Sequence, residues 1–194
     1  MVTDWRRPLA LGLAAAALCA APAMAQTVSL AERIQLCGAC HGEDGNSRME
    51  KIPSLAGQPA FFILNQLFLM REGVRKVEAM APFVKELKDE DLTALSEHFS
   101  RLAPKRSVEP TDPALAKRGA EIAVKRACGS CHLPSLAGQE QMPRLAKQRI
   151  DYLVPTLKSY RDSPRPGADT AMSAAVAGAT DDDIAALAHY AASL

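Results

Sequence analysis

Aromatic residues make up only 5% of this 194-residue chain, which contains a single tryptophan. An excess of charge of one sign is also missing, since 23 basic and 22 acidic residues give a formal net charge of +1 at pH 7. A nucleic-acid-binding protein uses a clear excess of lysine and arginine to neutralise phosphates. We therefore expect no nucleic-acid partner.

The chain also has no apolar run of the roughly 20 residues that span a bilayer as a helix. Its longest run, residues 9–21, follows Arg6 and Arg7 and precedes the small residues Ala23-Met24-Ala25, which is the pattern of a secretory signal. We predict that residues 1–25 are cleaved from an exported protein. The mature chain then holds 21 basic and 21 acidic residues.

Two alternatives for the N-terminus are an uncleaved membrane anchor and a lipid attached to Cys19. The length of the apolar run disfavours the anchor. Leu18, directly before Cys19, disfavours the lipid because a small residue is usual at that position.

Cysteine is scarce outside two short segments. Beyond residue 25 the chain has four cysteines, all within Cys37-Gly38-Ala39-Cys40-His41 and Cys128-Gly129-Ser130-Cys131-His132. Two thiols at this spacing can add to the two vinyl groups of a haem, and the adjacent histidine then lies under the iron. We predict two covalently bound haem c groups. The thioethers come from Cys37, Cys40, Cys128 and Cys131, and the iron ligands on one side are His41 and His132.

Two other readings of the cysteines ignore the adjacent histidines. An oxidising compartment permits two disulfides. Four thiolates at C-x2-C spacing can also hold zinc.

The chain beyond residue 25 is a tandem repeat of one unit. It contains neither a strand pattern nor a phosphate-binding glycine loop. Pro-Ser-Leu-Ala-Gly-Gln at 53–58 corresponds to Pro-Arg-Leu-Ala-Lys-Gln at 143–148. Residues 134–139 are identical in sequence to 53–58, but they lie too close to His132. The residues that follow them also do not match the residues after 58, so we prefer the pairing with 143–148. Each unit ends in a helix with one core aromatic, Phe99 or Tyr190.

Helix signals are clear in both units. Ser29 and Glu32 have capping-box spacing ahead of the first haem motif. Asp89 and Thr180 are expected N-caps of the terminal helices, with acidic residues in the first turn. Pro155 falls inside an expected helix and should kink or shorten it.

The stretch 104–112 is flanked by prolines and should be an extended, fairly stiff linker. It separates a first domain, 26–103, from a second domain, 113–194. Each is about 80 residues, which is small for an unaided hydrophobic core. A covalently held porphyrin supplies the missing apolar mass. The predicted fold is all-α, with two tandem domains of a few short helices around a haem.

The second iron ligand decides what each haem can do. Met80 lies 39 residues after His41 and Met172 lies 40 residues after His132, each in a loop after the matched helix. We expect these methionines to close each haem iron, because the thioether is a soft ligand that raises the reduction potential. The other methionines considered are Met49, Met70 and Met142.

Two further pairs match between the units. His98 and His189 could make bis-histidine haems, although an exposed or capping histidine is the commoner role at such positions. Arg71 and Arg161 either bind haem propionates through their planar guanidinium groups or are exposed helix charges.

On these residues the chain resembles the dihaem cytochromes c4, built from two class I cytochrome c domains. The most specific parts are 37–47, 53–58, 80–102 and 172–194. The resemblance implies one His/Met haem per domain about a pseudo-twofold axis. It implies a periplasmic electron carrier, often loosely membrane-associated, that receives electrons from a redox partner and feeds a terminal oxidase, with no catalytic residues. Residues 133–142 depart from the first unit's Gly-Glu-Asp-Gly-Asn sequence.

Two other functions stay open. Similar dihaem chains are electron-acceptor subunits of periplasmic dehydrogenases, acting on sulfide or alcohols. A dihaem enzyme, such as a peroxidase or thiosulfate dehydrogenase, needs an exchangeable ligand on one iron, and a methionine in both units argues against it.

Overall fold

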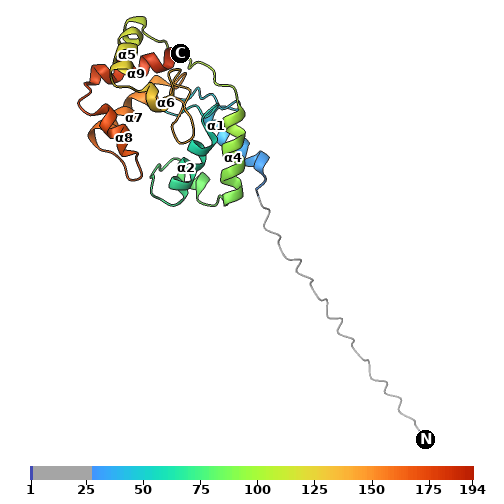
Figure 1. The fold of residues 1–194 in the computed structure, drawn as a ribbon. Helices are drawn as coiled ribbons and strands as arrows, with labels where there is room; N and C mark the ends of the chain where they lie inside the picture. The colour runs from blue at the N-terminus through green and yellow to red at the C-terminus, as the bar shows by residue number, and fades with distance from the viewer. Residues whose placement is uncertain (2–27) are drawn as a thin grey trace.

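The computed structural model describes Met1 and residues 28–194, so the predicted signal peptide, its cleavage site and Cys19 lie outside the described residues. Within 28–194 the chain is helical and forms no β-strand, only one isolated bridge between Gln139 and Met142. The predicted all-α fold is therefore confirmed. Helices of the two units lie on opposite sides of the molecule (Figure 1). None of the helices described combines the length and the apolar character needed to cross a membrane.

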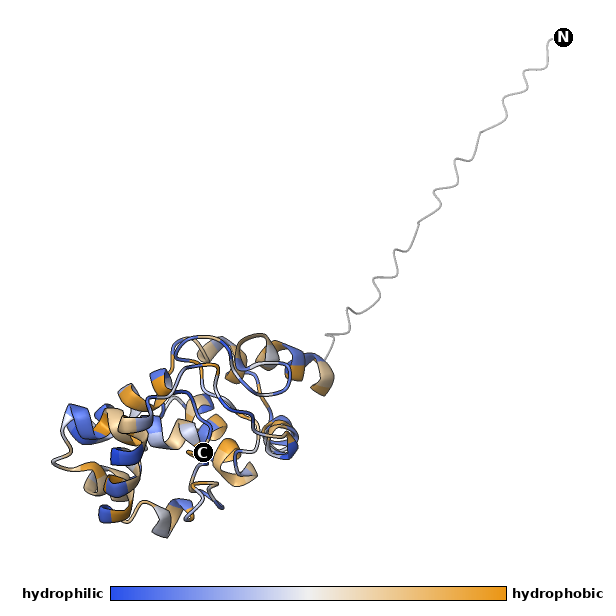
Figure 2. Ribbon diagram, turned by 90° about the horizontal axis from the view of Figure 1, so that it is seen from above, coloured by the Kyte–Doolittle hydropathy of each residue, from blue (hydrophilic) through white to orange (hydrophobic). Residues whose placement is uncertain are grey.

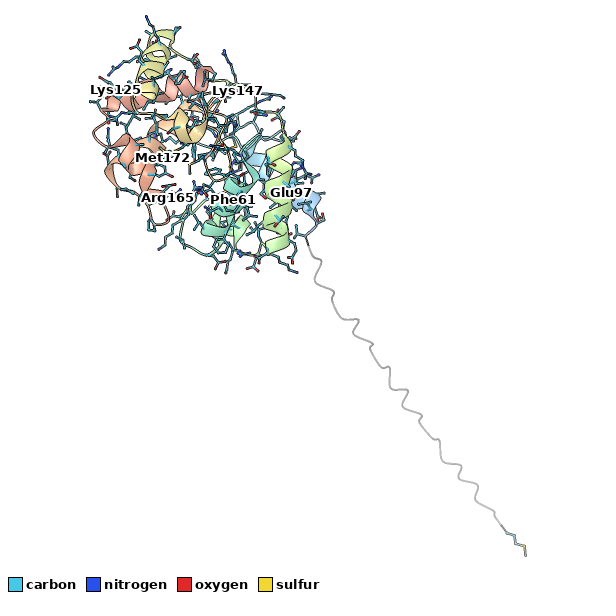
Figure 3. All side chains as sticks on the ribbon, viewed as in Figure 1. Phe61, Glu97, Lys125, Lys147, Arg165 and Met172 are labelled. Carbon is cyan, nitrogen blue, oxygen red and sulfur yellow. The ribbon has the colours of Figure 1, made fainter. Side chains whose placement is uncertain are left out.

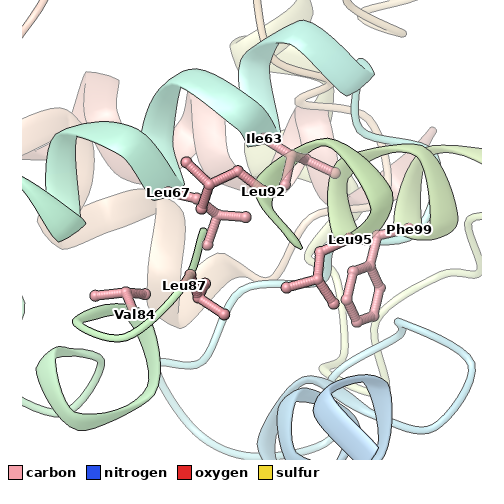
Figure 4. Close-up of a cluster of buried hydrophobic side chains, with 7 residues drawn as sticks. All are labelled: Ile63, Leu67, Val84, Leu87, Leu92, Leu95 and Phe99. Carbon is pink, nitrogen blue, oxygen red and sulfur yellow. The ribbon is translucent and has the colours of Figure 1, made fainter. Parts of the chain in front are cut away.

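The first unit has its core between two helices and a short turn of helix. Its helices are α1 (Leu30–His41), α2 (Ala60–Arg71), α3 (Ala81–Val84) and α4 (Asp89–Arg101). Figure 4 shows the core cluster, in which α2 and α4 face each other. Its buried members are Ile63, Leu67, Val84, Leu87, Leu92, Leu95 and Phe99. The predicted apolar face of α4 and its aromatic are confirmed.

The second unit repeats this arrangement with one more helix. Its helices are α5 (Pro113–Lys125), α6 (Gly129–His132), α7 (Ile150–Asp162), α8 (Thr170–Val176) and α9 (Asp181–Ser193). The closest packing joins α5 and α9. There, a Cβ on Gly119 would overlap the carbonyl oxygen of Ala186, so only glycine fits this crossing. Figure 2 shows apolar and polar residues alternating along the helices, as half-buried helices require.

The helix ends test three of the sequence signals. Ser29 and Glu32 form the predicted capping box, and the Thr180 hydroxyl accepts from Asp183 N at 3.1 Å. The prediction for Asp89 is wrong by one residue, because Asp89 already begins α4 and Lys88 precedes it. Asp89 still places a carboxylate in the first turn, where the helix dipole favours it.

Of the two effects expected of Pro155, the shortening of its helix is wrong and the kink stays a prediction. α7 runs through Pro155 for 13 residues, one more than α2. Proline removes the N–H that would bond to the carbonyl four residues earlier. Leu153 and Leu157 on either side of it are both buried, and this packing offsets the missing hydrogen bond.

Four reciprocal hydrogen bonds join the two units. The side chain of Gln58 donates to Arg144 O at 2.9 Å and accepts from Arg144 N at 2.9 Å. The side chain of Gln148 donates to Ser54 O at 2.9 Å and accepts from Ser54 N at 2.8 Å. The offset of 90 residues relates Gln58 to Gln148 and Ser54 to Arg144. The boundary is therefore built on a pseudo-twofold axis.

A buried ion cluster supports the same boundary on one side. Arg149 is only 2% exposed and donates to both carboxylate oxygens of Asp151, at 2.9 and 2.7 Å. Asp151 also accepts from Lys51 N at 3.0 Å, which ties it to the first unit. Glu109 from the intervening segment accepts from the backbone N–H of Ile150 and of Asp151, both at 2.9 Å, and so caps α7.

Candidate haem sites

The two motif histidines have the same surroundings. His41 ends α1 and His132 ends α6, and the Nδ1 of each lies 2.8 Å from a proline carbonyl, that of Pro53 or Pro143. A carbonyl can only accept, so each Nδ1 is the N–H nitrogen and each Nε2 keeps its lone pair. The predicted pairing of 53–58 with 143–148, rather than with 134–139, is confirmed by these bonds.

Burial keeps both imidazoles neutral. It lowers the pKa of His41 and of His132, and the hydrogen bond to the proline carbonyl opposes this only partly. His132 Nε2 is buried and has no hydrogen-bond partner. A neutral ring held by its Nδ1–H, with an unpartnered nitrogen opposite, is the form in which histidine binds a metal.

A cavity opens directly beside His132 in the second unit. Its walls include Cys128, Cys131 and Met172, the last of which comes from α8. Most of the remaining lining is aliphatic, with Tyr190 as the aromatic. These residues fit a porphyrin, which needs an apolar slot, two thiols at one edge and ligands on both faces. Met142 also lines the cavity, so lining alone does not separate it from Met172. Figure 3 shows where Met172 lies in this unit.

The first unit gathers the equivalent side chains. Cys37 and Met80 both pack against the core cluster of Figure 4, as Cys128 and Met172 pack against the core of the second unit. Met80 immediately precedes α3, whereas α8 carries Met172, so the expectation that Met172 lies in a loop is wrong. Met70 packs against the same cluster from α2.

None of the four motif cysteines forms a disulfide, so the disulfide interpretation does not hold in this structure. Burial raises the pKa of the Cys37 thiol and of the Cys128 thiol. Among residues 28–194 no three His, Cys, Asp or Glu side chains come together as a metal-ion site. The zinc reading, which needs all four thiolates together, is wrong.

Neither His98 nor His189 lines the haem cavity described above. The Nδ1 of His189 accepts from Asp112 N at 3.0 Å and so binds the start of the second unit. His98 stacks edge to face on Phe99, with ring centroids 5.1 Å apart. The Nε2 of His98 is buried and has no hydrogen-bond partner, so these contacts argue against bis-histidine ligation only in the second unit, where His189 is engaged and does not line the cavity.

Arg71 and Arg161 are engaged elsewhere, so the propionate role considered for them is not supported. The guanidinium of Arg71 bonds to Asp89 at 2.7 Å and to Leu87 O at 3.1 Å. Arg161 makes the equivalent contacts, to Asp181 at 2.8 Å and to Ala179 O at 2.9 Å. Both arginines therefore tie the helix they end to the start of the last helix of their unit.

Sequence reasoning missed the residues of the boundary. Gln58 and Gln148 are the last residues of the matched segments, and their identity in both units was the available signal. Arg75 and Arg165 also match at the 90-residue offset, and both contact Gln66. No local pattern indicates that these residues meet across two units.

Comparison with known proteins agrees with this geometry. The family model "Cytochrome c" matches residues 116–194, and "Cytochrome C oxidase, cbb3-type, subunit III" matches residues 23–98. Cytochrome c4 of Pseudomonas aeruginosa is 35% identical over 193 residues, which cover 94% of this chain and 93% of the relative. The thiosulfate dehydrogenase electron acceptor of Thiomonas intermedia is 32% identical, over 84% of this chain and 78% of the relative.

Solved structures give the same result. Reduced recombinant cytochrome c4 from Pseudomonas stutzeri aligns with a TM-score of 0.75 and 32% identity, over 87% of this chain and all of that chain. Thiosulfate dehydrogenase from Marichromatium purpuratum aligns with a TM-score of 0.68 and 31% identity, over 80% of this chain and 36% of that chain.

The two cytochrome c matches each contain one C-x-x-C-H motif, so the chain carries two covalently bound haem c groups. The extent of the likeness to cytochromes c4, in sequence and in fold, covers both haem sites and the boundary between them. The chain belongs to the cytochrome c4 family and is a dihaem electron-transfer cytochrome.

Proposed function

We propose that this protein is a periplasmic carrier that takes electrons from a respiratory-chain partner and delivers them to a terminal oxidase. In this proposal residues 1–25 direct export and are removed, and 104–112 link the domains 26–103 and 113–194. The relatives named cytochrome c4 support the carrier role. A redox partner on each side, rather than a substrate, is what such a protein binds.

We assign the haem ligands by the symmetry of the two units. Cys37 and Cys40 attach the first haem, whose iron lies between His41 and Met80. Cys128, Cys131, His132 and Met172 serve the second haem in the same way. The observation that supports the assignment is the cavity beside His132, which Met172 helps to line and into which the unpartnered Nε2 of His132 can supply a ligand. When bound, an iron held by nitrogen and thioether changes charge by one electron without taking a substrate.

An optical spectrum of the reduced protein with and without carbon monoxide tests the carrier role. Two strong ligands on each iron leave no position for carbon monoxide, so we expect no change at neutral pH. A shift that corresponds to one full haem would reveal an open coordination site and would exclude a simple carrier.

Single methionine variants test the ligand assignment. Met80→Ala and Met172→Ala should each halve the near-infrared sulfur-to-iron charge-transfer band of the oxidised protein, because one thioether of two is lost. Met49→Ala is the matched control, since Met49 is 48% exposed, and should leave the band intact. Met142→Ala separates the two methionines of the second cavity. A halved band in that variant, with a full band in Met172→Ala, would reverse our assignment.

A second function is favoured by two of the relatives. The Thiomonas intermedia protein is named as an electron acceptor of thiosulfate dehydrogenase, and the Marichromatium purpuratum structure is a thiosulfate dehydrogenase. The chain could accordingly accept electrons from a dehydrogenase of this class. Stopped-flow mixing of the oxidised protein with a reduced thiosulfate dehydrogenase and, separately, with a reduced respiratory donor distinguishes the two. Faster reduction by the dehydrogenase would favour the acceptor role.

A further inference from the structure

One side chain in the second unit joins the segment that attaches the haem to the helix that carries Met172. Arg126 directly follows α5 and lies two residues before Cys128. Its Nη1 donates to Ala175 O at 2.9 Å and to Ala177 O at 3.1 Å, at the end of α8. Arg126 lines the haem cavity together with Cys128 and Met172, so this link lies at the wall of that cavity.

The two acceptors are carbonyls of the kind that a cation binds well. The last carbonyls of a helix have no N–H partner within the helix, and the helix dipole makes this end negative. Ala175 lies in the last turn of α8 and Ala177 directly follows the helix. One guanidinium nitrogen carries two N–H donors, so it holds both carbonyls in one relative position. Arg126 therefore caps the C-terminus of α8 from a different element of the fold.

The helix α8 depends on such support because it is short. It has only seven residues, and a helix of this length is not stable by itself. Its start is held by Asp169, whose carboxylate accepts from Ala171 N at 2.8 Å. Its end is held by Arg126. Met172 lies between these two attachments, so the position of its sulfur depends on both of them.

The backbone from which Arg126 extends is itself fixed. The N–H of Arg126 donates to Ile122 O at 2.9 Å, and the N–H of Cys128 donates to Ala123 O at 2.9 Å. Ala123 is a buried member of the core of the second unit. The guanidinium therefore starts from a rigid segment, and this segment also carries a cysteine that attaches the haem.

The first unit has no equivalent of this link. The residue that matches Arg126, 91 positions earlier, is Gln35, which is exposed. The carbonyls that match the two acceptors are those of Phe83 and Lys85, at the offset of 92 that relates the two methionines. Among residues 28–194 no side chain donates to either carbonyl, whereas Arg126 donates to both of theirs. The second unit alone has this additional hold on its methionine segment.

We propose that Arg126 is a positioning residue that keeps Met172 on the iron of the second haem and slows its displacement. The proposal rests on the dihaem function and on the assignment of Met172 as a ligand. An entering ligand replaces the sulfur at the ferric iron without any change of oxidation state, and α8 must move away from the iron for this to happen. Such a movement breaks the two hydrogen bonds of Arg126, so the arginine adds to the barrier.

The size of the effect follows from those hydrogen bonds. One is part-buried and the other is exposed to solvent, so they do not contribute equally. Loss of the guanidinium should speed displacement of Met172 on the order of tenfold, the factor that about one hydrogen bond from a charged donor supplies. Displacement of Met80 should keep its rate.

The experiment mixes the oxidised holoprotein with excess imidazole and follows the loss of the near-infrared sulfur-to-iron band. Each variant is first shown by mass to carry both haems. In Met80→Ala the remaining band belongs to the second haem alone, and in Met172→Ala it belongs to the first. Arg126→Gln should speed the loss about tenfold in the Met80→Ala background and leave it unchanged in the Met172→Ala background. Arg126→Lys should give an intermediate rate, because it keeps the charge without the guanidinium geometry.

Two variants are matched controls. Gln35→Ala changes the equivalent position of the first unit. Arg118→Gln removes a charge from α5, the helix that Arg126 follows, where Arg118 pairs with Asp183 at 2.7 Å. Both should keep the parental rate at both haems.

An unchanged rate for Arg126→Gln in the Met80→Ala background would overturn the proposal. Equal acceleration in both backgrounds, or by Arg118→Gln, would also overturn it, because it would reveal a general loosening of the fold. Failure of the proposed function gives different results: a full band in Met172→Ala itself, or a carbon monoxide shift in the parent protein.

Discussion

The two units adopt the same backbone conformation with different residues. At three positions of positive φ that both units share, the first unit has glycine, with φ of 88°, 72° and 66°: Gly42, Gly45 and Gly57. The counterparts in the second unit, with φ of 68°, 54° and 61°, carry side chains: Leu133, Leu136 and Lys147. A residue other than glycine pays about 1–2 kcal/mol for this conformation. The loop around the haem histidine is therefore imposed by its tertiary contacts, and the second unit tolerates strain to keep it.

The approach to the haem motif differs as well. α1 continues without a break through Cys37 to His41, whereas α5 ends at Lys125 and a positive φ of 53° at Ala127 separates it from α6. The break lets α5 cross α9 at the close distance that Gly119 permits. The counterpart of Gly119 at an offset of 91 is Val28, which is 45% exposed. The second unit thus depends on a helix crossing that the first does not repeat at this position.

The largest effect should come from filling that crossing. Gly119→Val would drive side-chain atoms into the Ala186 carbonyl and the Cβ of Tyr190, and we expect a loss of about 3 kcal/mol or more in the free energy of unfolding. Val28→Ala at the matched position should change it by less than about 0.5 kcal/mol. Urea denaturation of the holoproteins, followed by circular dichroism, measures both. Equal effects would show that the two units use the same helix contact.

A medium effect is expected at the buried ion cluster. Asp151→Asn leaves Arg149 with only Glu109, 3.8 Å away, and should cost roughly 2 kcal/mol. Asp162→Asn removes an exposed partner of Arg161 and should produce no measurable change, since exposed pairs contribute little. The same denaturation experiment compares the two variants, and equal losses would contradict the special role of the boundary.

The pH dependence of this cluster has a definite sign. Burial would raise the pKa of Asp151, but the hydrogen bonds from Arg149 and from Lys51 N lower it below its ordinary value. The carboxylate therefore stabilises the folded protein fully above about pH 4, the ordinary carboxyl range, and this stabilisation is lost as the pH falls through the lower folded-state pKa. Unfolding measured from pH 6 down to pH 2 should show a smaller acid dependence in Asp151→Asn than in the parent protein.

The smallest effects come from exchanging residues at a shared left-handed position. Lys147→Gly should raise the free energy of unfolding by roughly 0.5–1 kcal/mol, because the relief of strain exceeds the entropy cost of glycine. Gly57→Ala should lower it by about 1–2 kcal/mol, since φ is +66° and the new Cβ would lie 2.9 Å from Pro104 Cδ. Thermal unfolding of the two variants measures this pair. A stabilised Gly57→Ala would refute the account of strain.

The sequence predicts those features that depend on short segments. The capping residues Ser29 and Thr180 follow from side-chain chemistry over one helical turn, and the repeat places Pro53 and Pro143 at the two histidines. Asp89 was misplaced by one residue because α4 starts with a run of acidic residues, each of which suits the first turn. Local rules also misjudge the length of the helix around Pro155, where Leu153 and Leu157 are both buried.

Features of the boundary could not be predicted in the same way. Gln58 and Arg144 are 86 residues apart, and their pairing depends on how two folded units meet. Ser54 and Arg144 are equivalent in the repeat, yet only the arginine brings a buried charge to the interface. A contact between residues so far apart leaves no periodic pattern in the sequence, so the sequence does not predict it.

The reciprocal glutamine bonds have a consequence for assembly. Because Gln58 holds residue 144 while Gln148 holds residue 54, the contact follows the rule of an isologous interface, in which the same patch meets itself. Here the two copies of that patch belong to the same chain and bind each other. A third module of this type would have no free glutamine with which to form these hydrogen bonds. This mode of pairing is therefore limited to two modules and does not extend into a longer array.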